Sequence, residues 1–344
     1  MKDKIKILVV EDLGLMRLII SNMLSRNAEI EVVGAASNGK EGFEKALQRK
    51  PDVIVSDMVM PEYDGLHLVK AVMESIPTPI ILVSALEKDS PQIFEALQAG
   101  AFDFVDKPGS QESRNADNDT LIRIIKEASK VDLAKLQRKE VVINQVKHDF
   151  PKDLIHDIAI IGASTGGTSA IETIIGSFPK NLPIPIIIAQ QTPQPFLESF
   201  AKRLNGLSPI PVKLAENKEI IVPGKVYVAP GWTDMVINRA SNEGEPVMEF
   251  TSEKLNQSNV PSIDRLLESA THIYGEKVMG ILLTGIGADG AQGLACVNER
   301  GGFTIAQNEA SSLVFSKPKA AIDLGVVKKV ADLADIPGLI VGSL

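Results

Sequence analysis

Three carboxylates, a hydroxyl and a lysine stand at the ends of short apolar runs in the first third of the sequence. These residues are Glu11, Asp12, Asp57, Ser84 and Lys107. Carboxylates packed together repel one another unless a cation lies among them, and Mg²⁺, a hard ion that prefers oxygen ligands, meets that demand. Lys107 and the hydroxyl of Ser84 can then each contact a phosphoryl oxygen. The pattern predicts a magnesium site on Glu11, Asp12 and Asp57 at which a carboxylate is phosphorylated.

A single acid after a strand has a simpler explanation, because such a residue often caps a helix or lies solvated in a loop. Here the polar residues follow the first, third, fourth and fifth of five predicted strands. The carboxyl ends of parallel strands meet at one crevice, where ligands bind. The placement of the whole set at that edge therefore favours a site over isolated loop charges.

A serine between glycines is the second candidate for chemistry. Ser164 lies in IAIIGASTGGTSAI, between Gly162 and the pair Gly166-Gly167. The turn is a weak match to a phosphate-binding loop, because it is not GxGxxG and no GK[ST] follows. A serine at a sharp strand-to-helix turn is how a nucleophile elbow presents its Oγ. The pattern by itself is equally typical of a plain tight turn.

A second glycine-rich strand end, LLTGIGADGAQG at 282–293, places Asp289 in its loop. An aspartate there can orient a histidine or stabilise the charge that a histidine acquires with a proton. The alternative is that Asp289 caps a helix predicted at 291–300, a common role for aspartate. The two roles are compatible.

Alternating strands and helices position these residues. In the first part of the chain we expect strands at 5–10, 32–36, 52–57, 79–85 and 103–107. The segments between them, such as 16–27 and 65–75, have the 3.6-residue apolar period of amphipathic helices. Strands that read as continuous apolar runs are buried on both faces, which is typical of a parallel sheet with crossover helices.

A second alternation begins after residue 153. Its predicted strands are IAIIGA, PIIIAQ, KVYVAP, VMGILLT and FTIAQ, and helices are expected at 262–275 and 291–301. The stretch 220–251 contains short strand patterns with turns at Pro223-Gly224 and Glu243-Gly244, which predict one or two antiparallel hairpins. The fold class is therefore α/β, with two doubly wound domains, the second mostly parallel.

A change in composition separates the two alternations. Residues 109–120 are polar and lack periodicity, and residues 121–139 can form a charged helix that leads to a tether. We place the first domain at 1–128, a linker at 129–152 and the second domain at 153–344.

Composition limits the possible partners and compartment. The 344 residues include 23% charged and 44% hydrophobic side chains, with a net charge of −8. This charge repels nucleic acid, and no apolar run approaches the roughly 20 residues needed to insert in a membrane. With Cys296 as the only cysteine, no disulfide can form within the chain, which fits a reducing cytoplasm. A protein or small-molecule partner is expected.

The first domain resembles a response-regulator receiver, a flavodoxin-like fold, over residues 4–128. The resemblance is carried by VVED, VIVSDMVMPEYDG, LVSA and GAFDFVDKP. It implies that Asp57 is the phosphorylated residue and that Ser84 and Lys107 support the phosphoryl group. It also implies Mg²⁺ on Glu11, Asp12 and Asp57. The acid pair is Glu-Asp rather than the commoner Asp-Asp.

The second domain resembles the CheB-type protein-glutamate methylesterases over about 154–340. The matching segments are IGASTGG, KEIIVPGKVYVAPG, PSIDRLLESA, LLTGIGADGAQGL and TIAQNEASSLVFSKPKAA. The resemblance implies that Ser164 is the nucleophile and Asp289 a member of a catalytic triad, with no cofactor in this domain. It implies methylated glutamates and some glutamines on the cytoplasmic helices of chemoreceptors as substrates, and a chemotaxis histidine kinase as partner.

The sequence departs from this family at the base of the triad. The histidine that follows the second strand is Gln191 here, aligned through Gln190, Pro193 and Phe196. An amide cannot take the serine proton, although Gln191 can form a hydrogen bond with Ser164. Two further departures are Asp234 at a usual histidine in APGWTDM, and SKP at 316–318 in place of GMP.

No other histidine is expected to replace the missing one. His156 and His272 are predicted at the wrong end of the sheet, His67 belongs to the first domain, and His148 lies in the tether. Two hypotheses follow. The chain is either a phosphorylation-controlled methylesterase and glutaminase, or an impaired member of that family that acts as a phosphorylation-dependent binding or regulatory module.

Overall fold

The chain folds into two compact units, residues 1–140 and 141–344. The computed structural model describes residues 4–84, 86–107, 114–136, 146, 150–192, 194–241, 244–251 and 260–344. Helix α5 ends at Ala128, and Leu136 beyond it is still buried in the first unit. The exact extent of a linker between the units stays a prediction.

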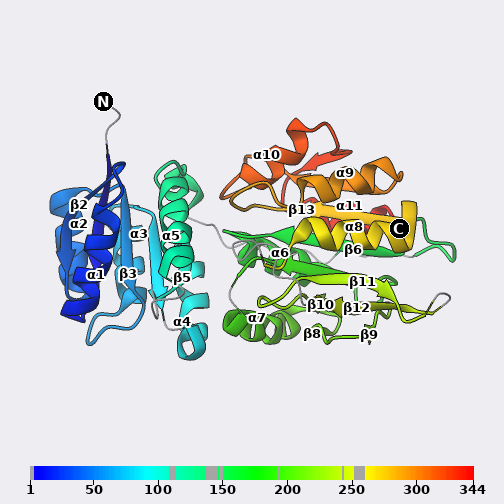
Figure 1. Ribbon diagram of the computed structural model, residues 1–344, viewed down its shortest axis with the longest axis horizontal. Helices are drawn as coiled ribbons and strands as arrows, with labels where there is room; N and C mark the ends of the chain where they lie inside the picture. The colour runs from blue at the N-terminus through cyan, green and yellow to red at the C-terminus, as the bar shows by residue number, and fades with distance from the viewer. Residues whose placement is uncertain are drawn as a thin grey trace. The chain divides into compact units, whose positions relative to one another are not determined.

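The first unit is a five-stranded parallel sheet in the order β2-β1-β3-β4-β5, flanked by helices (Figure 1). Its strands are β1 (Ile5–Val10), β2 (Ile30–Ala36), β3 (Val53–Asp57), β4 (Ile80–Ser84) and β5 (Asp103–Asp106). Its helices are α1 (Gly14–Ser25), α2 (Gly39–Arg49), α3 (Gly65–Ser75), α4 (Leu86–Gln98) and α5 (Arg114–Ala128). The predicted parallel sheet is confirmed.

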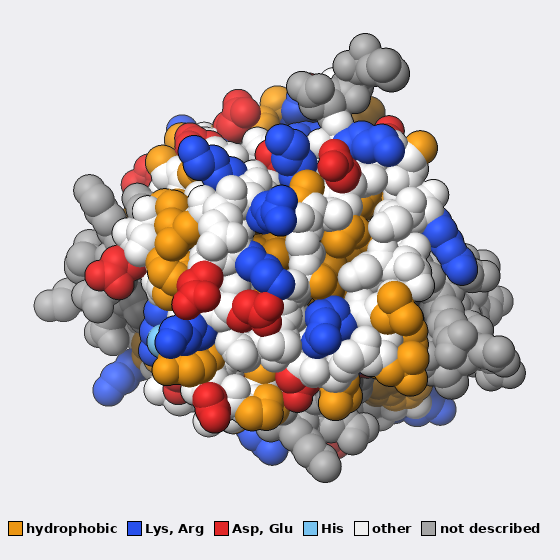
Figure 2. All heavy atoms as spheres, turned by 90° about the vertical axis from the view of Figure 1, so that its left-hand side faces the viewer, with side chains coloured by type: hydrophobic (Ala, Val, Ile, Leu, Met, Phe, Trp, Pro, Cys, Tyr) orange, Lys and Arg blue, Asp and Glu red, His pale blue; other side chains and the backbone are white. Residues whose placement is uncertain are grey.

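Helix α5 begins earlier than the composition indicates. Its first residues, from Arg114, lie within the polar stretch that was expected to lack helical structure. Leu121, Ile124 and Ile125 of its later part are buried, and these residues carry the apolar period by which the sequence predicts a helix. On the face in Figure 2, which is one side of this unit, acidic and basic side chains are interspersed with separate apolar groups.

The second unit is built on a seven-stranded sheet in the order β15-β14-β13-β6-β7-β10-β8, in which every neighbouring pair is parallel. Its strands are β6 (Ile158–Ala163), β7 (Ile186–Gln190), β8 (Val212–Leu214), β10 (Val226–Val228), β13 (Val278–Leu282), β14 (Phe303–Gln307) and β15 (Lys329–Ala331). The strand residues of β6, β7 and β13 are all buried.

Helices pack on this sheet in two contacting groups. They are α6 (Gly167–Gly176), α7 (Gln194–Leu207) and α11 (Ile336–Gly342) in one group, and α8 (Ile263–Tyr274), α9 (Ala291–Glu299) and α10 (Ser316–Asp323) in the other. The described residues also include two short 3₁₀ turns, Leu133–Lys135 in the first unit and Gly275–Lys277 in the second. Within the described residues, no helix has the length and apolar character to span a membrane.

A small antiparallel sheet, β11-β12-β9, accounts for the predicted hairpin region. Its strands are β9 (Glu219–Ile220), β11 (Met235–Arg239) and β12 (Pro246–Phe250). Met235, Ile237 and Met248 belong to the same core as the large sheet. The predicted turn at Glu243-Gly244 falls partly outside the described residues.

Close packing of α8 on β6 requires a glycine at 162. A Cβ at Gly162 would overlap the side chain of Ile263, the first residue of α8. Because overpacking a buried contact costs about 1–3 kcal/mol, we expect Gly162→Ala to lower the free energy of unfolding by that amount. Fluorescence of Trp232, the only tryptophan, measures the unfolding of this unit in urea.

The matched control is Gly206→Ala in α7, where a new Cβ meets nothing within 4 Å. This change should leave stability within about 0.5 kcal/mol of the native value or raise it, because alanine favours a helix. Equal stabilities for the two variants would contradict the close packing of α8 on β6.

Candidate functional site

Three neighbouring parallel strands bring the predicted catalytic residues to one edge of the large sheet. Ser164 follows β6, Gln191 follows β7, and the loop with Asp289 follows β13. The order β13-β6-β7 also contains the point at which the chain reverses its direction across the sheet. Ligands bind at such switch points in open α/β sheets. The predicted residues therefore share the edge where a substrate is expected.

Ser164 occupies a tight turn between β6 and α6. Its N–H donates to Thr284 O at 3.1 Å, and its carbonyl accepts from the N–H of Gly167 at 2.7 Å. Its Oγ accepts a hydrogen bond of 2.9 Å from the backbone N–H of Ile286, and the residue is 8% exposed. The turn continues through Gly166, whose φ of 78° suits glycine. The geometry is that of a serine held beside a backbone donor.

Only a glycine at 285 lets Ser164 and Lys317 pack against the same point of the backbone. A Cβ on Gly285 would overlap Ser164 Oγ and stand 2.7 Å from Lys317 Cδ. The hydroxyl of Ser164 and the side chain of Lys317 therefore both pack directly against Gly285, with no room for a methyl group between them. Any larger residue at 285 would displace one of them.

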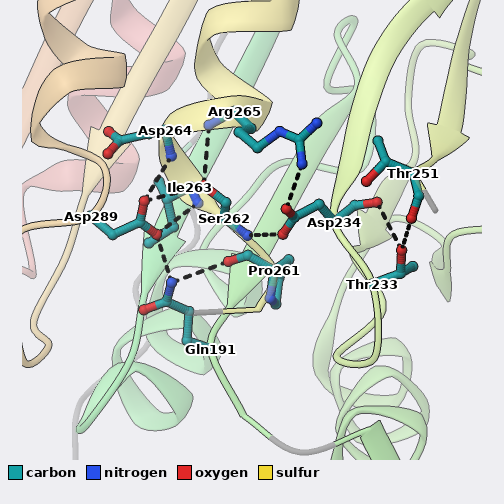
Figure 3. Close-up of polar contacts among 10 residues, drawn as sticks. All are labelled: Gln191, Thr233, Asp234, Thr251, Pro261, Ser262, Ile263, Asp264, Arg265 and Asp289. Carbon is teal, nitrogen blue, oxygen red and sulfur yellow. Dashed lines mark hydrogen bonds and ion pairs between the residues drawn. The ribbon is translucent and has the colours of Figure 1, made fainter. Parts of the chain in front are cut away.

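Gln191 and Asp289 are hydrogen-bonded to each other. Gln191 Nε2 donates to Asp289 Oδ2 at 2.6 Å and to Pro261 O at 3.1 Å (Figure 3). The expected hydrogen bond from Gln191 to Ser164 is absent among the described contacts, because both amide hydrogens point toward Pro261 and Asp289. Gln191 thus contacts the aspartate of the predicted triad but cannot serve as its base.

Asp289 lies at the beginning of α8 rather than capping α9. Its carboxylate accepts from the N–H groups of Ile263, at 2.8 Å, and Asp264, at 3.2 Å, and from Ser262 Oγ at 3.3 Å. The cap of α9 is Gly290, without a side-chain bond. The alternative that Asp289 caps the helix after it is therefore wrong. A carboxylate at α8 satisfies N–H groups that have no partner within the helix.

The carboxylate of Asp264, in α8, forms hydrogen bonds with the start of α9. Its Oδ1 accepts from Gly290 N at 2.8 Å and Gly293 N at 2.7 Å, at the start of α9. Burial raises the pKa of Asp264 to about 6; the N–H bonds oppose this shift, and the nearby Asp289 adds to it. Asp289 thus binds the start of α8, the helix that contains Asp264, and Asp264 binds the start of α9, the helix that follows Asp289.

Asp234, at a usual histidine position of the family, forms an ion pair instead. Asp234 Oδ2 lies 2.8 Å from Arg265 Nη1, and its Oδ1 accepts from Ser262 N at 2.8 Å (Figure 3). A cavity of about 560 Å³ lies beside this pair, lined by Asp234, Ser262, Asp264, Arg265, Ala288, Asp289, Ala291, Gln292, Ala320 and Leu324. Ser164 does not line this cavity.

The receiver residues also meet at a switch point, where β1 and β3 are adjacent. Ligand oxygens of Glu11, Asp12 and Asp57 lie within 4.8 Å of one another. Lys107 Nζ is 2.7 Å from Asp57 Oδ2 and 3.3 Å from Glu11 Oε2. Ser84 is fully buried at the end of β4, one residue after Val83, which pairs with Asp57. The structure brings all five predicted residues to one edge.

The acid cluster has the electrostatics of a cation site. Burial, followed by the charge of Asp57, raises the pKa of Glu11 to about 7, and burial raises the pKa of Asp57. Glu11 Oε2 is buried and has no hydrogen bond, since its contact with Lys107 is an ion pair without hydrogen-bond geometry. A divalent cation bound by three carboxylates would satisfy that oxygen, so the donor set fits one.

Comparison with known proteins finds a matching family for each of the two domains. Residues 7–116 match the response regulator receiver domain and residues 159–340 match the CheB methylesterase family. A protein-glutamate methylesterase/protein-glutamine glutaminase of Archaeoglobus fulgidus is 40% identical and covers 96% of this chain and 95% of its own length. A protein of the same name from Methanococcus maripaludis is 38% identical and covers 97% of this chain and 96% of its own length.

The crystal structure of the Thermotoga maritima CheB methylesterase catalytic domain is also similar. It is 35% identical, superimposes with a TM-score of 0.53 and covers 55% of this chain and 99% of that one. The chain belongs to the CheB methylesterase family. It joins the receiver and methylesterase domains of that family in one polypeptide.

Within this CheB-family fold, the described histidines do not replace the missing base. His156 precedes β6, where its Nδ1 lies 2.8 Å from Ser343 O, and His272 is in the last turn of α8. His67 is in α3 of the receiver domain. His148, in the predicted tether, lies outside the described residues.

Sequence reasoning assigned no role to Lys317. Its side chain is fully buried, and Nζ donates to Asp289 O at 3.1 Å. The available signal was a charged residue in SKP, where the CheB family has a methionine. The meaning of that signal depends on the neighbours of Lys317, which are 28 to 153 residues away in sequence.

The Asp264 carboxyl should make stability depend on pH. Because its pKa is raised in the folded state, its stabilising contribution is present below about pH 4 and is lost as the pH rises through about 6. Asp264→Asn keeps an oxygen acceptor for Gly290 and Gly293 but removes the charge. We expect the variant to gain about 1–2 kcal/mol relative to the native chain between pH 4 and pH 7.

Urea unfolding followed by Trp232 fluorescence at several pH values measures this difference. The control is Asp335→Asn, an exposed aspartate in the same domain. Parallel stability curves for the native chain and Asp264→Asn would contradict the raised pKa.

Proposed function

We propose that this chain is a protein-glutamate methylesterase and glutaminase controlled by phosphorylation of Asp57. Its substrates would be methyl esters of glutamate and some glutamines on the cytoplasmic helices of chemoreceptors. The observation that carries the proposal is the arrangement of Ser164 in a strand-to-helix turn, with its Oγ on the N–H of Ile286. The family assignment adds the reaction class.

The geometry supports a defined role for each residue in ester hydrolysis. Ser164 Oγ attacks the ester carbonyl, and the N–H of Ile286 is near enough to donate to the oxyanion that forms. Asp289 is held by α8 and by Gln191. Gln191 fixes the carboxylate in place but provides no base, since an amide has no basic nitrogen.

The receiver domain supports phosphorylation by a histidine kinase. We infer that Asp57 accepts the phosphoryl group and that Lys107 and Ser84 contact its oxygens. Glu11, Asp12 and Asp57 would hold Mg²⁺, which supplies positive charge to the incoming phosphoryl group. Lys107 is already paired with Asp57 and can compensate the negative charge that phosphorylation adds.

One observation supports a second candidate function. The hydrogen bond from Gln191 to Asp289 occupies the position where the family has its base. A chain in which nothing else accepts the serine proton would hydrolyse esters poorly. It would then act as a phosphorylation-dependent binding or regulatory module of the same fold.

Methanol release from methylated receptor membranes tests the proposed activity. We expect purified, phosphorylated protein to release methanol and Ser164→Ala to abolish the release, because the variant has no nucleophile. Ser177→Ala, at the end of α6, is the matched serine control and should retain the rate. If the native chain releases none and Gln191→His creates the activity, the module function is correct instead.

Phosphorylation of the receiver can be tested separately. Acetyl phosphate with Mg²⁺ should label the native chain, and Asp57→Asn should remove the label because the acceptor carboxylate is lost. Asp106→Asn, at an exposed position one residue before Lys107, is the control and should still be labelled. Labelling of Asp57→Asn at the native level, or labelling that is indifferent to chelation of Mg²⁺, would contradict this assignment.

A further inference from the structure

A buried lysine packs next to Ser164. Lys317 is fully buried, and its Cδ and Ser164 Oγ both pack directly against Gly285. The backbone N–H of Lys317 donates to Gly285 O at 3.1 Å, which fixes the base of the side chain at this place. Lys317 therefore approaches Ser164 from the first turn of α10.

The far end of the same side chain contacts the third predicted catalytic residue. Lys317 Nζ donates to the backbone oxygen of Asp289 at 3.1 Å. The carboxylate of Asp289 is separately engaged by α8 and Gln191. Nζ is thus held at the loop of Asp289, two bonds beyond the Cδ that packs against Gly285 next to Ser164 Oγ. Rotation about the last two side-chain torsions changes the distance between Nζ and that oxygen.

A buried amine has the chemistry that Gln191 lacks. Burial favours the neutral form of an amine over the ammonium, and a neutral amine carries a lone pair that can accept a proton. Serine nucleophiles paired with a lysine base occur on several folds. An apolar residue would be the less costly occupant of this buried position, since a buried amine must be compensated by polar contacts.

We infer that Lys317 is the general base that activates Ser164 in place of the absent histidine. This inference rests on the proposed methylesterase function and adds a catalytic residue to it. The amine removes the proton of Ser164 Oγ as Oγ bonds to the ester carbon. It returns that proton to the methoxide as the carbon–oxygen bond breaks and methanol leaves. The amine then removes a proton from a water molecule as the water oxygen bonds to the acyl carbon. It returns that proton to Ser164 Oγ as the bond between Oγ and the acyl carbon breaks, which leaves the receptor glutamate as a free carboxylate.

Two substitutions of Lys317 separate basicity from charge. Lys317→Met places an apolar side chain of similar length at the site, and this is the residue found in the family motif. Lys317→Arg keeps a cation that does not give up its proton. If the lysine is the base, both variants should lose at least about 100-fold in methanol release, since a positioned general base contributes 10²–10⁴-fold. A cation that merely stabilised the oxyanion would leave Lys317→Arg active.

Restoring the family histidine provides a rescue that a structural role would not. We expect Gln191→His to restore methanol release in the Lys317→Met background, because the imidazole can then bridge Asp289 and Ser164. Lys319→Met, which removes an exposed lysine two residues away on α10, is the control and should keep the native rate. Trp232 fluorescence in urea establishes that each variant is folded.

Reaction of Ser164 with a fluorophosphonate probe gives a readout that does not depend on the receptor. The full-length chain should be labelled at Ser164, and Lys317→Met should be labelled at least about 100-fold more slowly. If Lys317→Met and Lys317→Arg keep native rates in both assays while Ser164→Ala is inactive, the lysine is not the base and the methylesterase function stands. If the probe labels Ser164 in a lysine-dependent way but receptor membranes yield no methanol, the base is correct and the proposed substrate is wrong. A native chain inactive in both assays overturns both.

Discussion

The carboxylate of Asp289 connects most of the parts from which the methylesterase cleft is built. It accepts N–H groups at the start of α8 and the amide of Gln191 after β7, while its own backbone oxygen accepts from Lys317 on α10. Each of these partners comes from a different element of the fold. Because Asp289 follows β13, next to β6, the same bonds that satisfy α8 also set the distance between the loop and Ser164. Loss of the carboxylate would remove the acceptor of two helix N–H groups and of one of the two hydrogen bonds that Gln191 Nε2 donates.

The hydrogen bonds of Asp289 to α8 and of Asp264 to α9 explain why this edge of the sheet can hold two carboxylates close together. Asp289 binds the N-terminus of α8 and Asp264, in the first turn of α8, binds the start of α9. Each negative charge faces the positive end of a helix, which offsets part of their repulsion. Burial, with a smaller contribution from the charge of Asp289, nevertheless raises the pKa of Asp264. The site is thus held together by backbone donors, which remain in place when side chains in the cleft change.

Local sequence patterns were sufficient to predict where strands end, but not to predict contacts between segments that are far apart in the sequence. The predicted strands at 5–10, 158–163 and 303–307 agree with β1, β6 and β14, because a run of buried apolar residues defines a central strand with little ambiguity. Once the strands are parallel, Glu11, Asp57 and Lys107 must meet, and so must Ser164 and the loop of Asp289. The role of Asp289 at α8 was not predictable, since its partners Ile263 and Asp264 lie 25 to 26 residues earlier. The start of α5 was not predicted, because the residues before Leu121 are polar and have no apolar period.

Replacement of an imidazole by the amide of Gln191 keeps a hydrogen bond to Asp289 and removes the group that could accept the serine proton. Gln191 still donates to Asp289, so the loop stays in place and the cleft does not have to rearrange. What disappears is a nitrogen that can take a proton and return it. A cleft that had merely lost its function would gain stability from apolar residues in its buried positions, yet Lys317 is a fully buried lysine that packs next to Ser164, the proposed nucleophile. The energetic cost of that lysine is understandable if it restores the proton transfer that Gln191 cannot perform. The retained hydrogen bond and the added base then belong to one arrangement, in which orientation and proton transfer are divided between two side chains.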